Sequence, residues 1–137
     1  MTPDEARATT YTQFLTGWGT TTTVRLEGRE EAGEPGPGIP WVRVAFRNYG
    51  GGQQTLGPAG GRKYQRSGAA LVQVFTPITS GPGLGATLAH AARAILESRR
   101  FGDLVFNNGT ITEIPLRGGE KNHQTNVEVR CTYDEEK

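Results

Sequence analysis

The sequence predicts an α+β domain in which one long helix and an N-terminal helix pack on a mostly antiparallel mixed sheet, with a long glycine-rich basic arm. Three observations support this class. Residues 84–96 carry apolar side chains at helical spacing, and residues 125–133 alternate between apolar and polar side chains without a break. The strand-like segments also follow one another in hairpin-like runs, not in strict βαβ alternation. At 137 residues the chain is expected to form a single domain, 1–137.

Residues 3–16 are expected to form the N-terminal helix. Thr2 is placed to cap it, Pro3 suits its first turn, and the acids that follow complement the positive end of the helix dipole. Its apolar patch has i, i+3, i+4, i+7 spacing and consists of Tyr11, Phe14, Leu15 and Trp18. The threonine- and valine-rich segment Thr20–Leu26 then predicts a first strand, and residues 27–40 predict an acidic loop.

Two further strands are predicted in the middle of the chain. In Trp41–Phe46, the side chains of Val42, Val44 and Phe46 point to one side of the strand. Ala70–Pro77 is largely apolar on both of its sides, which is typical of a central strand.

The second half of the chain predicts the main helix, a hairpin and a last strand. The helix covers Gly83–Ser98, and its apolar stripe consists of Leu84, Leu88, Ala91, Ala92, Ile95 and Leu96. Asn108-Gly109 is a strong signal for a tight turn, so residues 104–106 and 110–116 are expected to pair as a hairpin. In the last strand, Thr125–Tyr133, every second side chain is expected to face the core.

The formal net charge of +1 hides a division of the chain into zones. Residues 1–34 hold six acids and three bases, residues 35–96 hold six bases and no acid, and residues 97–137 hold eight acids and six bases. Two interpretations are open. A cationic middle and anionic ends could meet across neighbouring copies, or the composition has drifted and salt screens most of the difference. Glycine, at 20 of 137 residues, leaves a thin core that association would supplement.

Composition excludes several common classes. With Cys131 as the only cysteine, an internal disulfide framework and a cysteine-rich zinc site are excluded. No apolar run approaches the length of a membrane-spanning helix. The N-terminus lacks the basic start and apolar run of a signal peptide. We therefore expect a soluble protein that has no membrane contact and is not exported by that route.

Two glycine motifs resemble nucleotide-binding loops without meeting their requirements. In Gly57–Lys63, arginine stands where a P-loop needs glycine, and the tyrosine that follows stands where it needs serine or threonine. Gly81–Ala86 matches the dinucleotide pattern G-x-G-x-x-A, but Pro77 and Pro82 restrict its turn, and no second βα unit follows. Its glycines are expected to cap and space a helix that packs closely on the sheet.

No catalytic signature is present. His90 and His123 lack a metal-ligand partner at i+3 or i+4. Ser67 and Ser80 lack the context of a nucleophile elbow, and the acids Glu30–Glu31 fall in a loop. We expect no catalytic, cofactor or metal site, and no enzyme.

The predicted arm, residues 47–68, holds seven glycines, four cations and no acid. Loops of this length in compact domains are uncommon unless they have a function. Its cations and tyrosines could neutralise phosphates and stack bases, although a pI of about 7.9 falls short of the strongly basic footprint of a nucleic-acid binder. A mobile linker is another alternative. A glycine-rich hairpin arm that orders against a partner fits best.

Four segments occur in an order that resembles a known family. They are WVRVAF, a glycine-rich basic loop ending in KYQRSG, ALVQVFTPITSGPG running into LGATLAHAARAI, and TNVEVRCTYDE. Over roughly residues 38–135, this combination resembles the tail terminator-like proteins of long-tailed bacteriophages, prophages and phage-derived particles, whereas the N-terminal helix matches only in kind. The resemblance implies a sheet with helices packed on it. It also implies a non-enzymatic virion protein whose hexameric ring caps the tail tube, stops tail polymerisation and presents a surface for joining the head.

The resemblance also implies binding partners and a location for the protein. The chain would be made and assembled in the bacterial host cytoplasm and would act at the head-tail junction of the virion. Its partners would be copies of itself, the tail tube protein and head-completion or connector proteins, with genome DNA as a further contact if the arm lines the lumen. The partner-binding side chains would be Arg47, Tyr49, Arg62, Lys63, Tyr64 and Arg66 of the arm, with Arg117 and Lys121 of the loop at residues 117–123. The acidic, proline-rich loop at 34–40 has no counterpart that we can place.

Two other classes stay open. A head-completion or stopper protein of the same junction would share the ring and the partners, and cross-links to the portal but not to the tube would distinguish it. A small nucleic-acid-binding module would bind without sequence preference and with a steep salt dependence. That affinity would be lost when Arg62, Lys63 and Arg66 become alanine.

Overall fold

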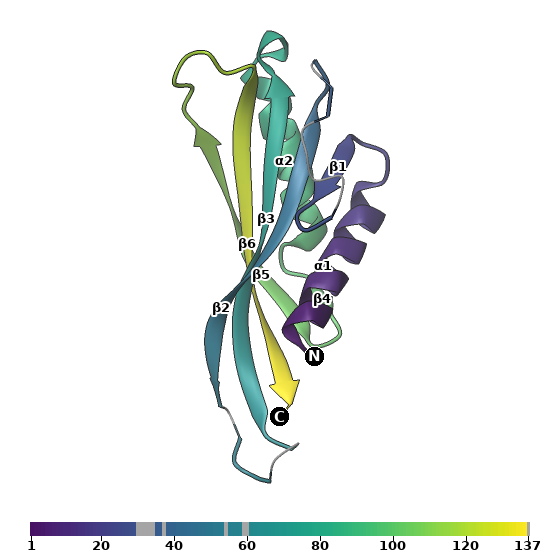
Figure 1. Ribbon diagram of the computed structural model, residues 1–137, viewed down its shortest axis with the longest axis vertical. Coiled ribbons are helices and arrows are strands. Elements are labelled where there is room, and N and C mark those ends of the chain that lie inside the picture. The colour runs from purple at the N-terminus through teal and green to yellow at the C-terminus, as the bar shows by residue number, and fades with distance from the viewer. Residues whose placement is uncertain (30–34, 37, 54, 59–60, 137) are drawn as a thin grey trace.

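The computed structural model describes residues 1–29, 35–36, 38–53, 55–58 and 61–136. Across these residues it has two helices and one six-stranded mixed sheet, so the predicted α+β class is confirmed. In chain order the elements are α1 (Pro3–Trp18), β1 (Thr23–Leu26), β2 (Trp41–Gln53), β3 (Lys63–Pro77), the short 3-10 helix η1 (Ile78–Ser80), α2 (Pro82–Leu96), β4 (Arg100–Phe101), β5 (Leu104–Ile114) and β6 (Asn122–Glu136). The two helices lie against each other on one face of a strongly twisted sheet (Figure 1).

The strand order across the sheet is β1-β2-β3-β6-β5-β4. β1, which occupies the last four residues of the predicted first strand, is parallel to β2, and the other neighbouring pairs are antiparallel. β3 lies between β2 and β6, so the central position predicted for Ala70–Pro77 is confirmed. β3 and β6 pair along their whole length, from Lys63 opposite Glu136 to Pro77 opposite Asn122. At 15 residues each, they are well beyond the usual strand length of about 5–6 residues.

α1 begins as predicted and ends two residues later than predicted. The hydroxyl of Thr2 accepts a hydrogen bond from the Glu5 amide at 3.2 Å, and the Glu5 carboxylate accepts one from the Thr2 amide at 3.1 Å. This reciprocal capping box satisfies backbone donors that the first turn leaves free. Phe14 and Trp18 are buried, with their rings stacked at 5.2 Å. Leu15, expected in the same apolar patch, is 40% exposed.

α2 packs closely on the sheet through a glycine. A Cβ on Gly85 would lie 3.1 Å from the Thr125 hydroxyl and 3.4 Å from the Thr76 hydroxyl, so a larger residue would push the helix away. Gly81, at φ +75°, precedes Pro82 at the helix start. The predicted capping role is confirmed for Gly81 and the spacing role for Gly85, whereas nothing lies within 4 Å of a Cβ on Gly83. In the described chain, α2 has 15 residues and α1 has 16, so the expected single long helix is not present.

No helix in the described part of the chain is long and apolar enough to cross a membrane.

Most of the segment predicted as an arm, residues 47–68, is strand. Residues 47–53 continue β2 and residues 63–68 begin β3, and the two pair antiparallel, with a bulge at Tyr49. β3 is paired on its other side with β6, so backbone hydrogen bonds order this half of the sheet although few of its side chains are buried. Between the strands lie residues 54–62, of which 54, 59 and 60 are outside the described residues. Residues 30–34 and 37 of the predicted acidic loop are also outside them.

The hairpin predicted at Asn108-Gly109 is wrong. β5 runs along β6 from Leu104 to Ile114, with a bulge immediately before Gly109. The Gly109 amide donates to the Glu97 carboxylate at 2.6 Å, and a Cβ at this position would lie 2.5 Å from Cγ of Arg93. The end of α2 thus presses on this point of the strand, and the glycine serves a bulge instead of a tight turn.

The alternation predicted for the last strand is confirmed. The five inward-facing residues are all buried, namely Thr125, Val127, Val129, Cys131 and Tyr133. All of them except Thr125 join one core cluster with the buried faces of β2, β3 and both helices. Burial raises the pKa of the Cys131 thiol to about 12, so the side chain is protonated and unreactive at neutral pH.

We predict that replacing Cys131 with valine makes the protein less sensitive to alkaline pH. The thiol pKa is 9.0 without burial, as in the unfolded chain, and about 12 in the folded chain. The unfolded chain therefore loses this proton first as the pH rises. The contribution of the protonated Cys131 thiol to the free energy of unfolding is therefore complete below pH 9 and is lost progressively towards pH 12. Urea unfolding of both proteins between about pH 7 and about pH 10 should show the steeper decline in the wild type. Tyr11 and Tyr133, whose pKa values burial also raises, are present in both proteins. Equal slopes would contradict the prediction.

Candidate functional site

The side chains predicted to bind a partner lie in two separate regions. Six belong to the hairpin of β2 and β3, namely Arg47, Tyr49, Arg62, Lys63, Tyr64 and Arg66. Arg117 and Lys121 belong to the loop that joins β5 to β6. The tip of the hairpin and this loop lie at opposite ends of the sheet (Figure 1). Within one chain, the structure therefore does not bring the two groups together.

Two of the predicted cations are engaged inside the chain. Both terminal nitrogens of Arg47 donate to the Glu27 carboxylate, at 2.8 and 2.9 Å. These hydrogen bonds lower the pKa of Glu27 and raise that of Arg47. Arg66 Nε donates to the Glu135 carboxylate at 2.9 Å, and Glu135 is only 8% exposed. Both arginines thus stabilise the chain that carries them.

The pairing of β3 with β6 gives a third explanation of the charge zones. The basic start of β3 lies beside the acidic end of β6, with Lys63 opposite Glu136 and Arg66 bonded to Glu135. Acids and bases from distant parts of the sequence therefore meet within one chain. Neither sequence interpretation, contact between copies or compositional drift, includes this arrangement. Salt screens the exposed charges of this region more than the largely buried Arg66–Glu135 pair.

Both tyrosines of the hairpin contact an arginine. The guanidinium carbon of Arg130 lies 5.7 Å from the ring centroid of Tyr49, and that of Arg66 lies 5.0 Å from the ring of Tyr64. Each such contact contributes about 0.5–1 kcal/mol at an exposed site. Tyr49 is the extra residue of the β2 bulge and is 54% exposed, so it offers a partner more surface than the half-buried Tyr64.

The tip of the hairpin exposes an apolar side chain that sequence analysis missed. Leu56 is 93% exposed. Next to it, Arg62 Nε donates to the Gly57 carbonyl at 2.7 Å, and the Lys63 amide donates to the Thr55 hydroxyl at 2.8 Å. These bonds support the described part of the tip. A single leucine in a glycine- and glutamine-rich stretch was the only sequence signal for this feature.

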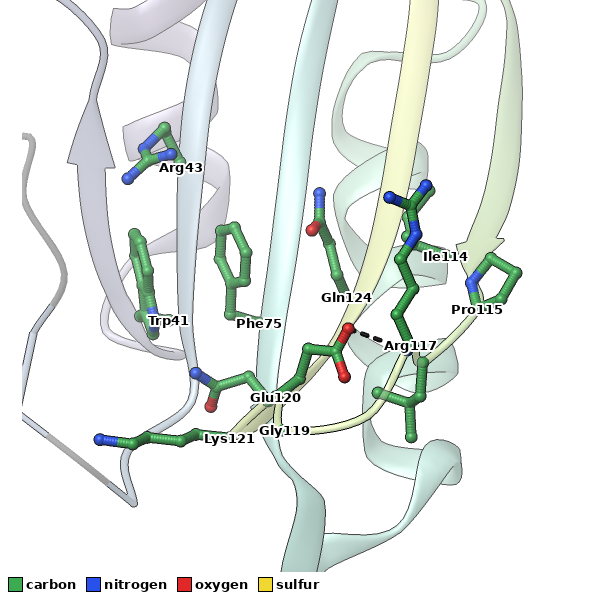
Figure 2. Close-up of a pocket in the computed structure, with 12 residues that line it drawn as sticks. Trp41, Arg43, Phe75, Ile114, Pro115, Arg117, Gly119, Glu120, Lys121 and Gln124 are labelled. Carbon is green, nitrogen blue, oxygen red and sulfur yellow. Dashed lines mark hydrogen bonds between the residues drawn. The ribbon is translucent and has the colours of Figure 1, made fainter.

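At the opposite end, a cleft of about 720 Å³ opens on the face of the sheet turned away from the helices (Figure 2). We call it the sheet-end cleft. Trp41 of β2 stacks on Phe75 of β3 with ring centroids 4.3 Å apart, and the guanidinium of Arg43 lies 5.2 and 5.8 Å from these two centroids. The wall comes from the end of β5 and the β5–β6 loop, and includes Ile114, Pro115, Leu116, Arg117, Glu120 and Lys121.

The β5–β6 loop is braced by its own hydrogen bonds. The Glu120 carboxylate accepts one from the Arg117 amide at 2.8 Å, and this bond lowers the pKa of Glu120. Gly118 and Gly119, at φ +95° and +79°, adopt a backbone conformation that other residues rarely take. The Lys121 carbonyl accepts a hydrogen bond of 3.2 Å from the backbone at the start of η1. The loop therefore presents the side chains of Arg117 and Lys121 at the cleft from a fixed backbone.

The sequence indicated the two cations of this loop but not the aromatic floor of the cleft. Trp41 and Phe75 are direct neighbours in the register of β2 and β3. The alternation of WVRVAF already placed Trp41 and Arg43 on the same side of their strand, opposite the core residues. Only the strand pairing brings Phe75 beside them.

The start of α1 and the end of β6 bring several acids close to the hairpin. The Met1 ammonium donates to the Asp134 carbonyl at 3.0 Å. A hollow of about 360 Å³ lies here. Its acidic side chains are Glu5, Asp103, Asp134, Glu135 and Glu136, and its cations are Lys63 and the Met1 ammonium. We call this region the acidic end.

Other titratable groups do not form a site in the part of the chain that the structure describes. Nowhere in it do three or more histidine, cysteine, aspartate or glutamate side chains gather to hold a metal ion. His90 is exposed on α2 beside Arg93, at 3.0 Å, and His123 lies near the start of β6.

Comparison with known proteins supports the fold. No protein-family model matches the chain, and no curated protein matches it significantly. One solved structure that does match, named only by a sequence identifier, has 17% sequence identity, a TM-score of 0.56 and coverage of 93% of each chain. At this identity the likeness shows a common fold and nothing of function.

We predict that Gly51→Ala disrupts the hairpin and that Gly52→Ala does not. A Cβ on Gly51 would lie 1.9 Å from the Gln65 carbonyl oxygen of the paired strand, whereas nothing lies within 4 Å of a Cβ on Gly52. The expected loss of unfolding free energy is about 2 kcal/mol or more for Gly51→Ala and within about 0.5 kcal/mol for Gly52→Ala. Urea unfolding measures both, and similar losses would contradict this geometry.

We also predict that Arg66 and Arg62 differ in their effect on stability. Arg66→Met leaves the largely buried Glu135 carboxylate without its ion-pair partner and should cost about 2–3 kcal/mol. Arg62→Ala removes a contact at the exposed tip and should change stability by no more than about 0.5 kcal/mol. Thermal unfolding measures both changes. Adding Glu135→Gln to Arg66→Met should recover part of the loss, and no recovery would mean that the charge pair is not its source.

Proposed function

We propose that this chain is a non-enzymatic structural protein that assembles head to tail into a ring. In this proposal it is a tail terminator-like component of a virion, located at the head-tail junction. The ring caps the tail tube, stops its growth and offers the surface to which the head joins. The basis for the tube and head as partners is the resemblance of the four sequence segments to the tail terminator-like family.

The observation that carries the proposal is the reach of the β2–β3 hairpin, residues 47–68. Its tip lies well beyond the ends of both helices (Figure 1), and it presents Leu56 almost fully to solvent. An exposed apolar side chain gains nothing in the isolated chain and is stabilising once a partner covers it. This supports the hairpin as an arm that reaches another protein subunit.

The unlike ends of the chain support head-to-tail assembly. The hairpin tip and the acidic end lie together at one end of the sheet. The sheet-end cleft, with its cations, lies at the other. Contact between two unlike surfaces repeats from copy to copy and closes into a ring when the rotation between copies completes a full turn. A like-with-like contact would stop at a dimer instead.

The predicted partner-binding residues divide into two roles under this proposal. Tyr49, Arg62 and Lys63 on the hairpin, and Arg117 and Lys121 at the cleft, are placed to contact other subunits. Arg47, Tyr64 and Arg66 support the hairpin through their contacts within the chain. DNA in the lumen of the ring is a further contact that this proposal allows.

The proposal predicts a discrete oligomer of about six copies in solution, measured by light scattering after size exclusion over a range of protein concentrations. A variant in which an Asn-Gly turn replaces residues 54–63, so that Gln53 stays opposite Tyr64, should remain folded by circular dichroism and should not assemble. A wild-type monomer that binds DNA with a steep salt dependence would favour the nucleic-acid module instead. Cross-links from a particle to the portal, without any to the tube, would favour a head-completion protein.

A further inference from the structure

We propose that the sheet-end cleft is the docking site for the opposite end of a second copy of this chain, with Leu56 of that copy seated on the aromatic floor. This inference rests on the proposed head-to-tail assembly and deepens it by naming the two surfaces that meet. The hairpin tip and the acidic end supply one surface, and the cleft supplies the other.

The apolar parts of the two surfaces are complementary. Leu56 is a single aliphatic side chain, 93% exposed, at the narrow end of a hairpin. The cleft offers the partly exposed ring of Phe75, which stacks on the buried Trp41, and, on its wall, Leu116, which is 47% exposed. Its volume of about 720 Å³ is within the usual range of about 300–1,000 Å³ for ligand pockets, so it has room for a leucine side chain.

The charges are complementary as well. Arg117 and Lys121 stand at the cleft on the braced β5–β6 loop. At the acidic end, Asp134 and Glu136 are exposed at the close of β6, beside the hairpin. Opposite charges on two surfaces speed their encounter and select the correct orientation.

The hairpin tip carries two cations, Arg62 and Lys63, into a cleft that also holds cations. Each of these two cations has an acid to face. The cleft contains an acid, Glu120, whose carboxylate can face Arg62 of the incoming tip. Lys63 of the tip already lies opposite Glu136 of its own chain. The contact therefore brings no cation of the tip into the cleft without an acid beside it.

The two surfaces cannot meet within one molecule, because they lie at opposite ends of a long sheet (Figure 1). Each copy therefore offers its tip to one neighbour and receives the tip of another. This is a heterologous contact of the kind that propagates around a ring.

Charge reversal with mutual rescue tests the contact. The cleft variant carries Arg117→Glu and Lys121→Glu, and the end variant carries Asp134→Lys and Glu136→Lys. Each variant alone should associate at least about tenfold more weakly than the wild type in analytical ultracentrifugation. An equimolar mixture should recover assembly, because the acidic end of one variant meets the basic cleft of the other, and the basic end of the second meets the reversed cleft of the first.

The apolar anchor has a matched control. Leu56→Ser should weaken association by at least about tenfold, whereas Leu15→Ser, which changes an exposed leucine on α1 away from both surfaces, should leave association within about twofold of the wild type. Thermal unfolding of each variant separates a loss of contact from a loss of fold.

A cross-link gives an independent readout of proximity. A chain with Leu56→Cys mixed with a chain with Leu116→Cys should form an intermolecular disulfide on mild oxidation, and neither chain alone should form this heterodimer. The buried, protonated Cys131 does not compete.

The outcomes separate this inference from the proposed function. If the wild type forms rings, both charge-reversed variants form them equally well and no mixed disulfide appears, this contact is overturned and the ring proposal stays intact. A wild-type chain that stays monomeric at all concentrations and forms no mixed disulfide would overturn both. Loss of assembly in each variant, with recovery in the mixture, is the expected result.

Discussion

The antiparallel pairing of β3 with β6 is the interaction on which the rest of this molecule depends. It runs over the full 15 residues of each strand, from Lys63 opposite Glu136 to Pro77 opposite Asn122. One half of this ladder lies under the two helices and carries the core. The other half runs on past the helices, where backbone hydrogen bonds supply the order that buried side chains supply elsewhere. A glycine-rich segment therefore becomes part of a sheet although it can fill no core.

The same pairing of β3 with β6 also determines where many of the charged side chains lie. It places the basic start of β3 beside the acidic end of β6, and the largely buried pair of Arg66 and Glu135 follows from that register. Some of the cations that distinguish the middle of the sequence are thus used to hold the chain together. Five acids line the hollow at one end of the sheet, while Arg117 and Lys121, with Glu120 beside them, stand at the other. A chain of nearly zero net charge therefore has two chemically different ends.

These ends explain how a thin core and a function in assembly can go together. A small glycine-rich domain has little apolar surface to bury by itself, and this one leaves Leu56 and an aromatic cleft on its surface. Both features are unfavourable in isolation and useful in a repeated contact between copies. The head-to-tail proposal uses the exposed surface of the hairpin and of the open face of the sheet in the same assembly.

The sequence by itself determined the elements whose signals are local. The capping box at Thr2, most of the apolar stripe of α2 and the alternation of β6 depend on neighbours within a few residues, so composition and spacing were sufficient. In the α2 stripe, Ala91 was predicted to face the core but is exposed, and Ala89 is buried instead. It also indicated which loops carry cations. Only the tertiary structure decided the rest. Asn108-Gly109 has the local signal of a tight turn, but the end of α2 packs against it and makes it a bulge. The hairpin beyond the core and the stack of Trp41 on Phe75 arise from the register between strands, and register is a property of distant segments that no local pattern contains.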